Sequence, residues 1–85
     1  MTTIPTIHLN GTGKDTLTAE YYAAYKAIEA AVEALAAATS NCRDFYPQGA
    51  DAYSRHRKER AEAFACLRQA QGYVEEVLDG ICNQP

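Results

Sequence analysis

Two long segments of this chain repeat apolar residues at alternating steps of three and four, and this periodicity leaves few folds open. In residues 15–40 the repeat runs through Leu17, Tyr21, Ala24, Ile28, Ala31, Leu35 and Ala38. In residues 51–81 it runs through Tyr53, Arg60, Phe64, Leu67, Gln71, Val74, Leu78 and Ile81. Such spacing places side chains on one face of a helix and is typical of an antiparallel hairpin or coiled-coil seam. The sequence therefore predicts an all-α fold, an antiparallel two-helix hairpin.

The remaining residues fit around this hairpin as one domain, residues 1–85. Residues 1–14 contain Pro5, Gly11 and Gly13, which disfavour regular structure, so they predict an irregular N-terminal strap across the helices. Residues 41–50 form the turn between the helices. Asp15 or Thr16 is the expected N-cap of the first helix.

Small size and a second apolar line predict a homo-oligomer. A chain of 85 residues buries only about 60% of the surface that it exposes when unfolded, so its own core is marginal. The three cysteines show no metal-ligand or disulfide spacing, so the fold is not expected to be stabilised by a bound metal or by disulfides. A second line on the first helix would face another protomer and give at least a four-helix dimer; its members are Tyr22, Tyr25, Val32, Ala36 and Ala37.

Several classes of protein are disfavoured. The chain shows no secretory signal pattern and no apolar run of transmembrane length, so we expect a cytoplasmic protein without a membrane partner. The net charge is −3, and five of the eight basic residues lie between positions 43 and 60. The four of them in residues 55–60 do not form one continuous helical stripe, which disfavours duplex nucleic acid as a partner. No residue pattern predicts a cofactor, a metal site or a catalytic residue, so we expect a protein that is not an enzyme.

Two segments have the composition of an anion site, and each also has a structural interpretation. Residues Gly11–Thr16 place glycine N–H groups and Lys14 before a helix N-terminus, which suits either an anion or simple capping. The cluster at residues 55–60 places cations in the first turns of the second helix, where they oppose the helix dipole. It fits either an anionic partner or a solvated face paired with nearby acidic residues. His8, beside Asn10 and Thr12, fits a hydrogen-bonded structural role better than a catalytic one.

The turn carries more functional groups than a helix connection requires. Asn41 is suited to a left-handed C-terminal cap, and Asp44, Phe45, Pro47 and Gly49 fit a structural role. The remaining residues supply a guanidinium for phosphate, a ring for stacking and an amide for hydrogen bonds; they are Arg43, Tyr46 and Gln48.

The stretches "IHLNGT" (residues 7–12) and "NCRDFYPQG" (residues 41–49) together resemble a group of small phage and prophage helical-hairpin proteins. Members of that group carry glycine and tyrosine where this chain has Cys42 and Phe45. The resemblance covers nearly the whole chain and implies a phage-type protein acting in the host bacterial cytoplasm. Small phage proteins of this build often serve counter-defence, and signal-sequestering sponges look similar in architecture. The likeness to signal-sequestering sponges is an analogy of architecture and not of sequence.

The sequence thus predicts a non-enzymatic binding protein that sequesters a small anionic, nucleotide-like ligand. The expected ligand-binding residues are His8, Asn10, Gly11, Thr12, Lys14, Asn41, Arg43, Asp44, Tyr46 and Gln48. A helix of about 25 residues is about 40 Å long, so the two halves of this set lie at opposite ends of one hairpin. An antiparallel partner chain would join them in an intersubunit site. The alternative is an inhibitor or adaptor of a host defence protein, with the same polar loop as its contact surface.

Overall fold

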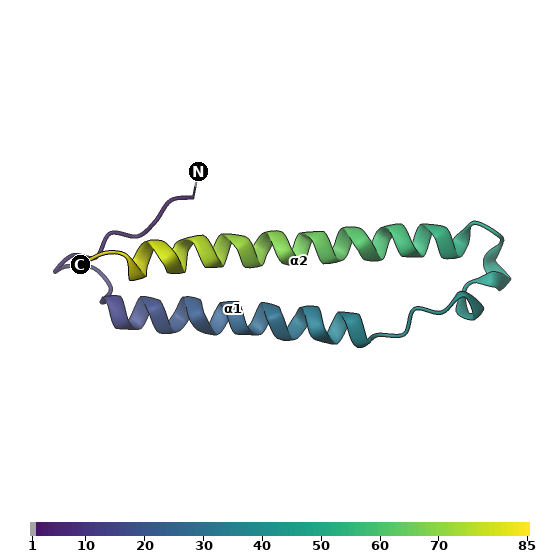
Figure 1. The fold of residues 1–85 in the computed structure, drawn as a ribbon, viewed down its shortest axis with the longest axis horizontal. Helices are drawn as coiled ribbons and strands as arrows, with labels where there is room; N and C mark the ends of the chain where they lie inside the picture. Colours follow the sequence, from purple (N-terminus) through teal and green to yellow (C-terminus); the bar gives the residue numbers. More distant parts are fainter. Residues whose placement is uncertain (1) are drawn as a thin grey trace.

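The computed structural model describes residues 2–85 and confirms the all-α hairpin (Figure 1). Helix α1 spans Lys14–Ala37 and helix α2 spans Ala52–Cys82. Two single-turn 3₁₀ helices join them, η1 at Cys42–Asp44 and η2 at Tyr46–Gln48, and no strand forms within the described part of the chain. The hairpin is a rod of 61 × 23 × 17 Å, and most of its tertiary packing lies between the two helices. None of its helices is both long and apolar enough to span a membrane.

The helix ends differ in detail from the sequence prediction. The residue that precedes α1 is Gly13, in an extended conformation and without a side-chain cap, in place of Asp15 or Thr16. Helix α1 stops at Ala37 because Ala38 turns into extended backbone, with φ −66° and ψ 134°. Asn41 is also extended, at φ −130°, so it does not adopt the left-handed cap.

The seam of the hairpin follows the predicted stripe on α2 and only part of the predicted stripe on α1. On α2, Val74 and Ile81 are buried, and Val77 is fully buried beside them. On α1 the most buried residue is Val32, and Tyr25 is half-buried, whereas Ala31 is exposed. Both Val32 and Tyr25 were expected to face another protomer. Val32 belongs to the intrachain core instead, whereas the other members of that line, Tyr22, Ala36 and Ala37, are exposed, so the prediction that the line faces another protomer is wrong at Val32 and stays a prediction elsewhere.

A polar cluster of Glu29, Arg68 and Gln71, whose side chains hydrogen-bond to one another, crosses the middle of the seam. Gln71 is buried, yet its amide donates to Glu29 Oε2 at 2.6 Å and accepts from Arg68 Nη1 at 2.6 Å. Arg68 Nη1 also contacts Glu29 Oε2 at 3.0 Å. The hydrogen bonds from Gln71 and Arg68 hold the pKa of Glu29 below its ordinary value. Because each polar atom has its partner only in one alignment, this group fixes the register of the two helices.

Each helix has its C-terminal carbonyls covered by a cation from the other helix. Arg60 of α2 donates to the carbonyl oxygens of Leu35, Ala36 and Ala38 at 3.0, 3.2 and 3.0 Å. At the opposite end, Lys14 Nζ donates to the carbonyl oxygens of Cys82 and Gln84 at 3.3 and 2.5 Å. The last carbonyls of a helix lack partners and carry the negative end of its dipole, so both contacts stabilise the hairpin.

Residues 2–13 form no helix or strand and pass along the C-terminal end of α2 (Figure 1). Gln84 binds this segment twice, accepting from Ile7 N at 2.9 Å and donating to Pro5 O at 2.7 Å. Thr2 also bonds to Glu76. Ile4 lies so close to Gly80 that a Cβ built on this glycine would sit 2.6 Å from Ile4 Cγ2. Gly80 therefore makes room for the N-terminal segment.

The two helical glycines of α2 give a matched pair of variants. Gly72 has open space around it, so Gly72→Ala is expected to raise the free energy of unfolding by about 0.5–1 kcal/mol through helix propensity. Gly80→Ala gains the same propensity but collides with Ile4, so residues 2–7 should detach and become sensitive to proteolysis. Chemical denaturation and limited proteolysis measure both effects. Equal behaviour of the two variants would contradict the close packing at Gly80.

Candidate functional site

The turn that joins the helices folds into two consecutive 3₁₀ turns held by its own backbone and one side chain. Asn41 Oδ1 accepts a hydrogen bond from the Arg43 backbone at 3.0 Å and so begins η1. Pro47 lies in η2, and Gly49 ends the turn at φ 115°. This backbone conformation is rare for residues with a Cβ, so the glycine is required where the chain turns into α2.

Aromatic stacking fixes the turn to the first two turns of α2. The Phe45 ring stacks on His56 with centroids 4.2 Å apart, and it lies 6.0 Å from the Tyr53 ring. Ser40 Oγ is 2.8 Å from His56 Nε2, so the segment that leaves α1 is attached to the same histidine. These contacts give the turn a defined position relative to the helix.

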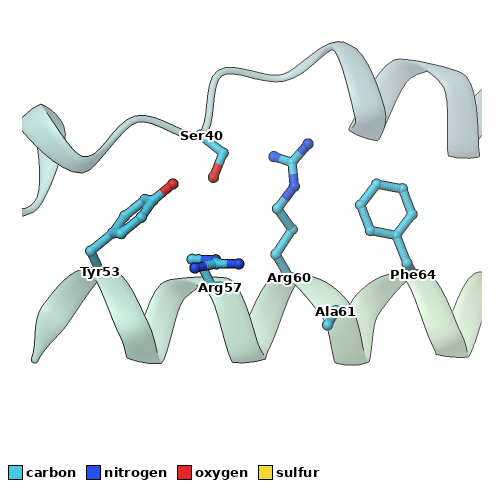
Figure 2. Close-up of a pocket in the computed structure, with 6 residues that line it drawn as sticks. All are labelled: Ser40, Tyr53, Arg57, Arg60, Ala61 and Phe64. Carbon is cyan, nitrogen blue, oxygen red and sulfur yellow. The ribbon is translucent and has the colours of Figure 1, made fainter.

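A cavity of about 260 Å³ lies directly beside this attachment (Figure 2). We call it the turn-end pocket, and it is lined by Ser40, Tyr53, Arg57, Arg60, Ala61 and Phe64. Figure 2 shows the residues of α2 projecting from successive turns of the helix, while Ser40 enters from the segment that follows α1. The pocket therefore combines two guanidinium groups, two aromatic rings and a hydroxyl on a short, rigid stretch.

The two arginines of the pocket are not equivalent. Arg60 is committed to the carbonyl oxygens at the end of α1, and its guanidinium lies 5.4 Å from the Phe64 ring centroid. Arg57 lies 6.0 Å from the Tyr53 ring centroid and, among residues 2–85, its guanidinium makes no hydrogen bond or ion pair. Arg57 therefore has all its donors available for an anion, whereas Arg60 contributes mainly positive charge.

The predicted ligand residues fall into two groups at opposite ends of the rod (Figure 1). Those of the turn lie at the same end as the pocket: Asn41, Arg43, Asp44, Tyr46 and Gln48. Tyr46 is 71% exposed and Arg43 is exposed, so both side chains are open to a partner. Those of the N-terminal segment lie at the other end: His8, Asn10, Gly11, Thr12 and Lys14. One chain therefore does not bring the two groups together.

Lys14 has a structural contact that the sequence did not indicate. Its ammonium group donates to two carbonyl oxygens at the C-terminus of α2. An ammonium group has three donors, so one N–H remains for another acceptor. His8 and Gly11 belong to a tight turn, in which the Gly11 N–H donates to the His8 carbonyl at 3.1 Å. A role in ligand binding stays a prediction for this group.

The pocket residues themselves were not predicted as ligands. The basic cluster at residues 55–60 was the available signal, because it placed cations where the helix dipole disfavours them. The structure divides that cluster. Arg57 and Arg60 line the turn-end pocket, while Arg55 and Lys58 line a second pocket of about 290 Å³ together with Glu59 and Glu62. These acidic neighbours compensate the positive charge of the second pocket, so the turn-end pocket is the stronger anion site.

Other kinds of site have little support in the described residues. No group of three or more histidine, cysteine or acidic residues is placed to hold a metal ion within residues 2–85. Cys42, Cys66 and Cys82 are exposed thiols. Comparison with protein-family models, with curated proteins and with solved structures finds no match.

Proposed function

We propose that this protein binds a small phosphorylated, nucleotide-like ligand at its turn end and sequesters it without chemical change. The observation that carries the proposal is the turn-end pocket, where the uncommitted Arg57 lies 6.0 Å from the Tyr53 ring centroid, at the same end of the rod as the exposed turn residues Arg43 and Tyr46. Phosphate favours guanidinium groups, and a planar base favours aromatic faces. Few other ligand classes use both.

Each group of the pocket has a defined part in this proposal. Arg57 pairs with phosphate oxygens, and the Ser40 hydroxyl adds a hydrogen bond. Tyr53 or Phe64 stacks on the base, while Arg43 and Tyr46 cover the ligand from the turn. The pocket of about 260 Å³ is open to solvent and slightly smaller than the usual small-molecule site of about 300–1,000 Å³, so one chain covers only part of a nucleotide.

A larger ligand needs a second chain in this proposal. The N-terminal group around Asn10 and Thr12 lies at the far end of the rod, so it reaches a ligand only from a neighbouring protomer. Such an intersubunit site would hold a second phosphate or a second base. The counter-defence role implied by the resemblance to small phage proteins is consistent with sequestration of a nucleotide signal, and it stays a prediction.

A host protein is the second candidate partner, and one observation favours it. Tyr46 and Leu9 are 71% and 99% exposed, more than a site closed over a small molecule requires. Exposed aromatic residues are common anchors at protein interfaces. Affinity capture from a host lysate separates the two candidates, because a stoichiometric host protein that is lost in Tyr46→Ala would support the inhibitor or adaptor role.

Arg57→Gln is expected to weaken ligand binding about 10- to 100-fold, because a hydrogen bond to a charged group contributes about 1.5–3 kcal/mol. A thermal-shift screen of the native protein against cyclic di- and trinucleotides, ADP-ribose and AMP first identifies the ligand. A true ligand stabilises in proportion to its concentration over Kd. Titration calorimetry then compares the variant with the native protein.

Arg55→Gln is the matched control, since it removes the same charge from the neighbouring turn of α2 outside the pocket. This control should keep its affinity within about twofold, the effect of screened surface charge alone. No thermal shift with any of these compounds, or equal losses in both variants, would contradict the proposed site.

A further inference from the structure

The hydroxyl of the turn-end pocket is held by a histidine that does not itself line the pocket. Ser40 lines the pocket, and its Oγ atom lies 2.8 Å from Nε2 of His56. His56 is half-buried, and the Phe45 ring stacks on it with centroids 4.2 Å apart. The Tyr53 ring, which lines the pocket, lies 6.0 Å from the imidazole. The imidazole is therefore fixed by neighbouring rings, and it acts on the pocket through Ser40.

The direction of the Ser40 hydrogen bond depends on the protonation of His56. A neutral imidazole has one nitrogen that accepts, and a hydroxyl that donates to it has no proton left for a ligand. A protonated imidazole donates from both nitrogens, so the Ser40 oxygen must then accept. Within residues 2–85 the Ser40 hydroxyl has no other hydrogen-bond partner. Protonation of His56 therefore frees the hydroxyl proton for an acceptor in the pocket.

The charges near His56 are mostly positive. On α2, Arg57 and Arg60 line the pocket, while the glutamates of the same stretch line the second pocket. In the turn, Arg43 and Asp44 carry opposite charges and precede the stacked ring. No carboxylate of the described residues forms an ion pair or a hydrogen bond with His56. An anion in the pocket would supply the missing negative charge, so anion binding and protonation of His56 favour each other.

We propose that His56 is a positioning residue of the turn-end pocket and that a phosphorylated ligand binds there together with a proton. Protonated His56 holds the Ser40 oxygen as an acceptor, and the Ser40 hydroxyl donates to a phosphate oxygen beside Arg57. Histidine is the side chain that takes up a proton between about pH 8 and pH 5. The affinity for phosphate therefore rises as the pH falls through this range. Because the ligand and the pocket are the same, this role of His56 rests on the proposed function.

The pH profile of binding tests this role with ligands whose own charge stays constant. ADP-ribose and cyclic dinucleotides keep their phosphate charges between about pH 6 and 8.5, whereas the phosphate of AMP takes up a proton near about pH 6. Titration calorimetry of the native protein with the first two should give a Kd about 3- to 10-fold lower at the acidic end, the effect of one additional hydrogen bond. Binding with a constant Kd would overturn the role of His56 alone. No binding at any pH would overturn the proposed function and this role with it.

Calorimetry in two buffers of different ionisation enthalpy counts the protons directly. The native protein should take up a fraction of one proton for each ADP-ribose or cyclic dinucleotide that it binds near neutral pH, because the ligand favours the protonated imidazole. This measurement requires no substitution, so it holds whether or not a variant folds. Binding without proton uptake would overturn the proposal.

Two variants assign the proton to this pair of side chains. His56→Gln keeps a hydrogen-bonding group beside Ser40 but does not titrate, so its Kd should be the same at both ends of the pH range. Ser40→Ala should bind more weakly at the acidic end and lose most of the pH dependence. Circular dichroism confirms that each variant keeps its helices. The chain has one other histidine, His8 in the N-terminal segment. A pH profile that is lost in His8→Gln and kept in His56→Gln would overturn the assignment.

Discussion

Arg60→Met is expected to lower the free energy of unfolding by about 2–3 kcal/mol, although the residue is a cation on a partly exposed helix. Its guanidinium donates to three carbonyl oxygens at the end of α1. A hydrogen bond to a charged group is worth about 1.5–3 kcal/mol, and a cation at a helix C-terminus adds to this. For a chain of this size, such a loss lowers Tm by about 10 °C or more. Urea denaturation and calorimetry measure it.

Arg57→Met provides the control for the Arg60 prediction. It makes the same chemical change one turn earlier on α2, at a guanidinium that makes no hydrogen bond within residues 2–85. The control should change stability by less than about 0.5 kcal/mol, as is usual at the surface. If both variants lost the same stability, the loss would reflect the removal of charge from the basic cluster in general. It would not reflect the hydrogen bonds from Arg60 to the carbonyl oxygens at the end of α1.

Ile81→Ala is expected to cost more, about 2–5 kcal/mol, as for other buried isoleucine and leucine side chains. Ile81 is one of two fully buried large side chains, and it lies beside the contacts of the N-terminal segment with α2. The variant leaves a cavity in the core at the end of the rod where the N-terminal segment packs on α2. We expect loss of protection of the Ile7 amide in hydrogen exchange as well as a lower midpoint of denaturation.

Leu9→Ala is the reference for that comparison, because Leu9 is 99% exposed. Removing its side chain should leave stability unchanged within about 0.5 kcal/mol. An Ile81 variant no less stable than the Leu9 variant would contradict the position of the core. Any ligand affinity that only the Leu9 variant loses would instead point to a contact made by the N-terminal segment.

The hairpin itself could be predicted from the spacing of apolar residues, and the seam of α2 could be predicted nearly residue by residue. The seam of α1 could be predicted only in part, because Leu17, Tyr21, Ile28 and Leu35 are half-buried as expected, whereas Val32 is buried in place of Ala31. In a helix so rich in alanine, the line through Ala24 and Ala31 and the line through Tyr25 and Val32 are both apolar. Only packing against α2 decides between them, and it buries the larger side chains. Alanine fits the apolar periodicity of a helix, but it does not determine which face of that helix packs against α2.

The candidate site was predicted only in part for a related reason. The turn drew attention because Arg43, Tyr46 and Gln48 exceed what a connection needs, and the structure places them at the pocket's end of the rod. The caps formed by Arg60 and Lys14 had no sequence signal. Each binds backbone carbonyls of the other helix, and any residue type supplies a carbonyl. A side chain that binds a backbone carbonyl does not require a particular residue type as its partner, so the sequence gives no signal for such a contact.

Nuclear magnetic resonance titration tests the central claim most directly. Native ¹⁵N-labelled protein is titrated with the compound that gives the largest thermal shift among the cyclic nucleotides, ADP-ribose and AMP. We expect saturable shift changes concentrated in residues 40–64, above all at Ser40, Arg57 and Phe64, with changes at residues 8–14 if a second chain completes the site. Changes confined to residues 8–14, or no saturable change with any of these compounds, would contradict binding at the turn end.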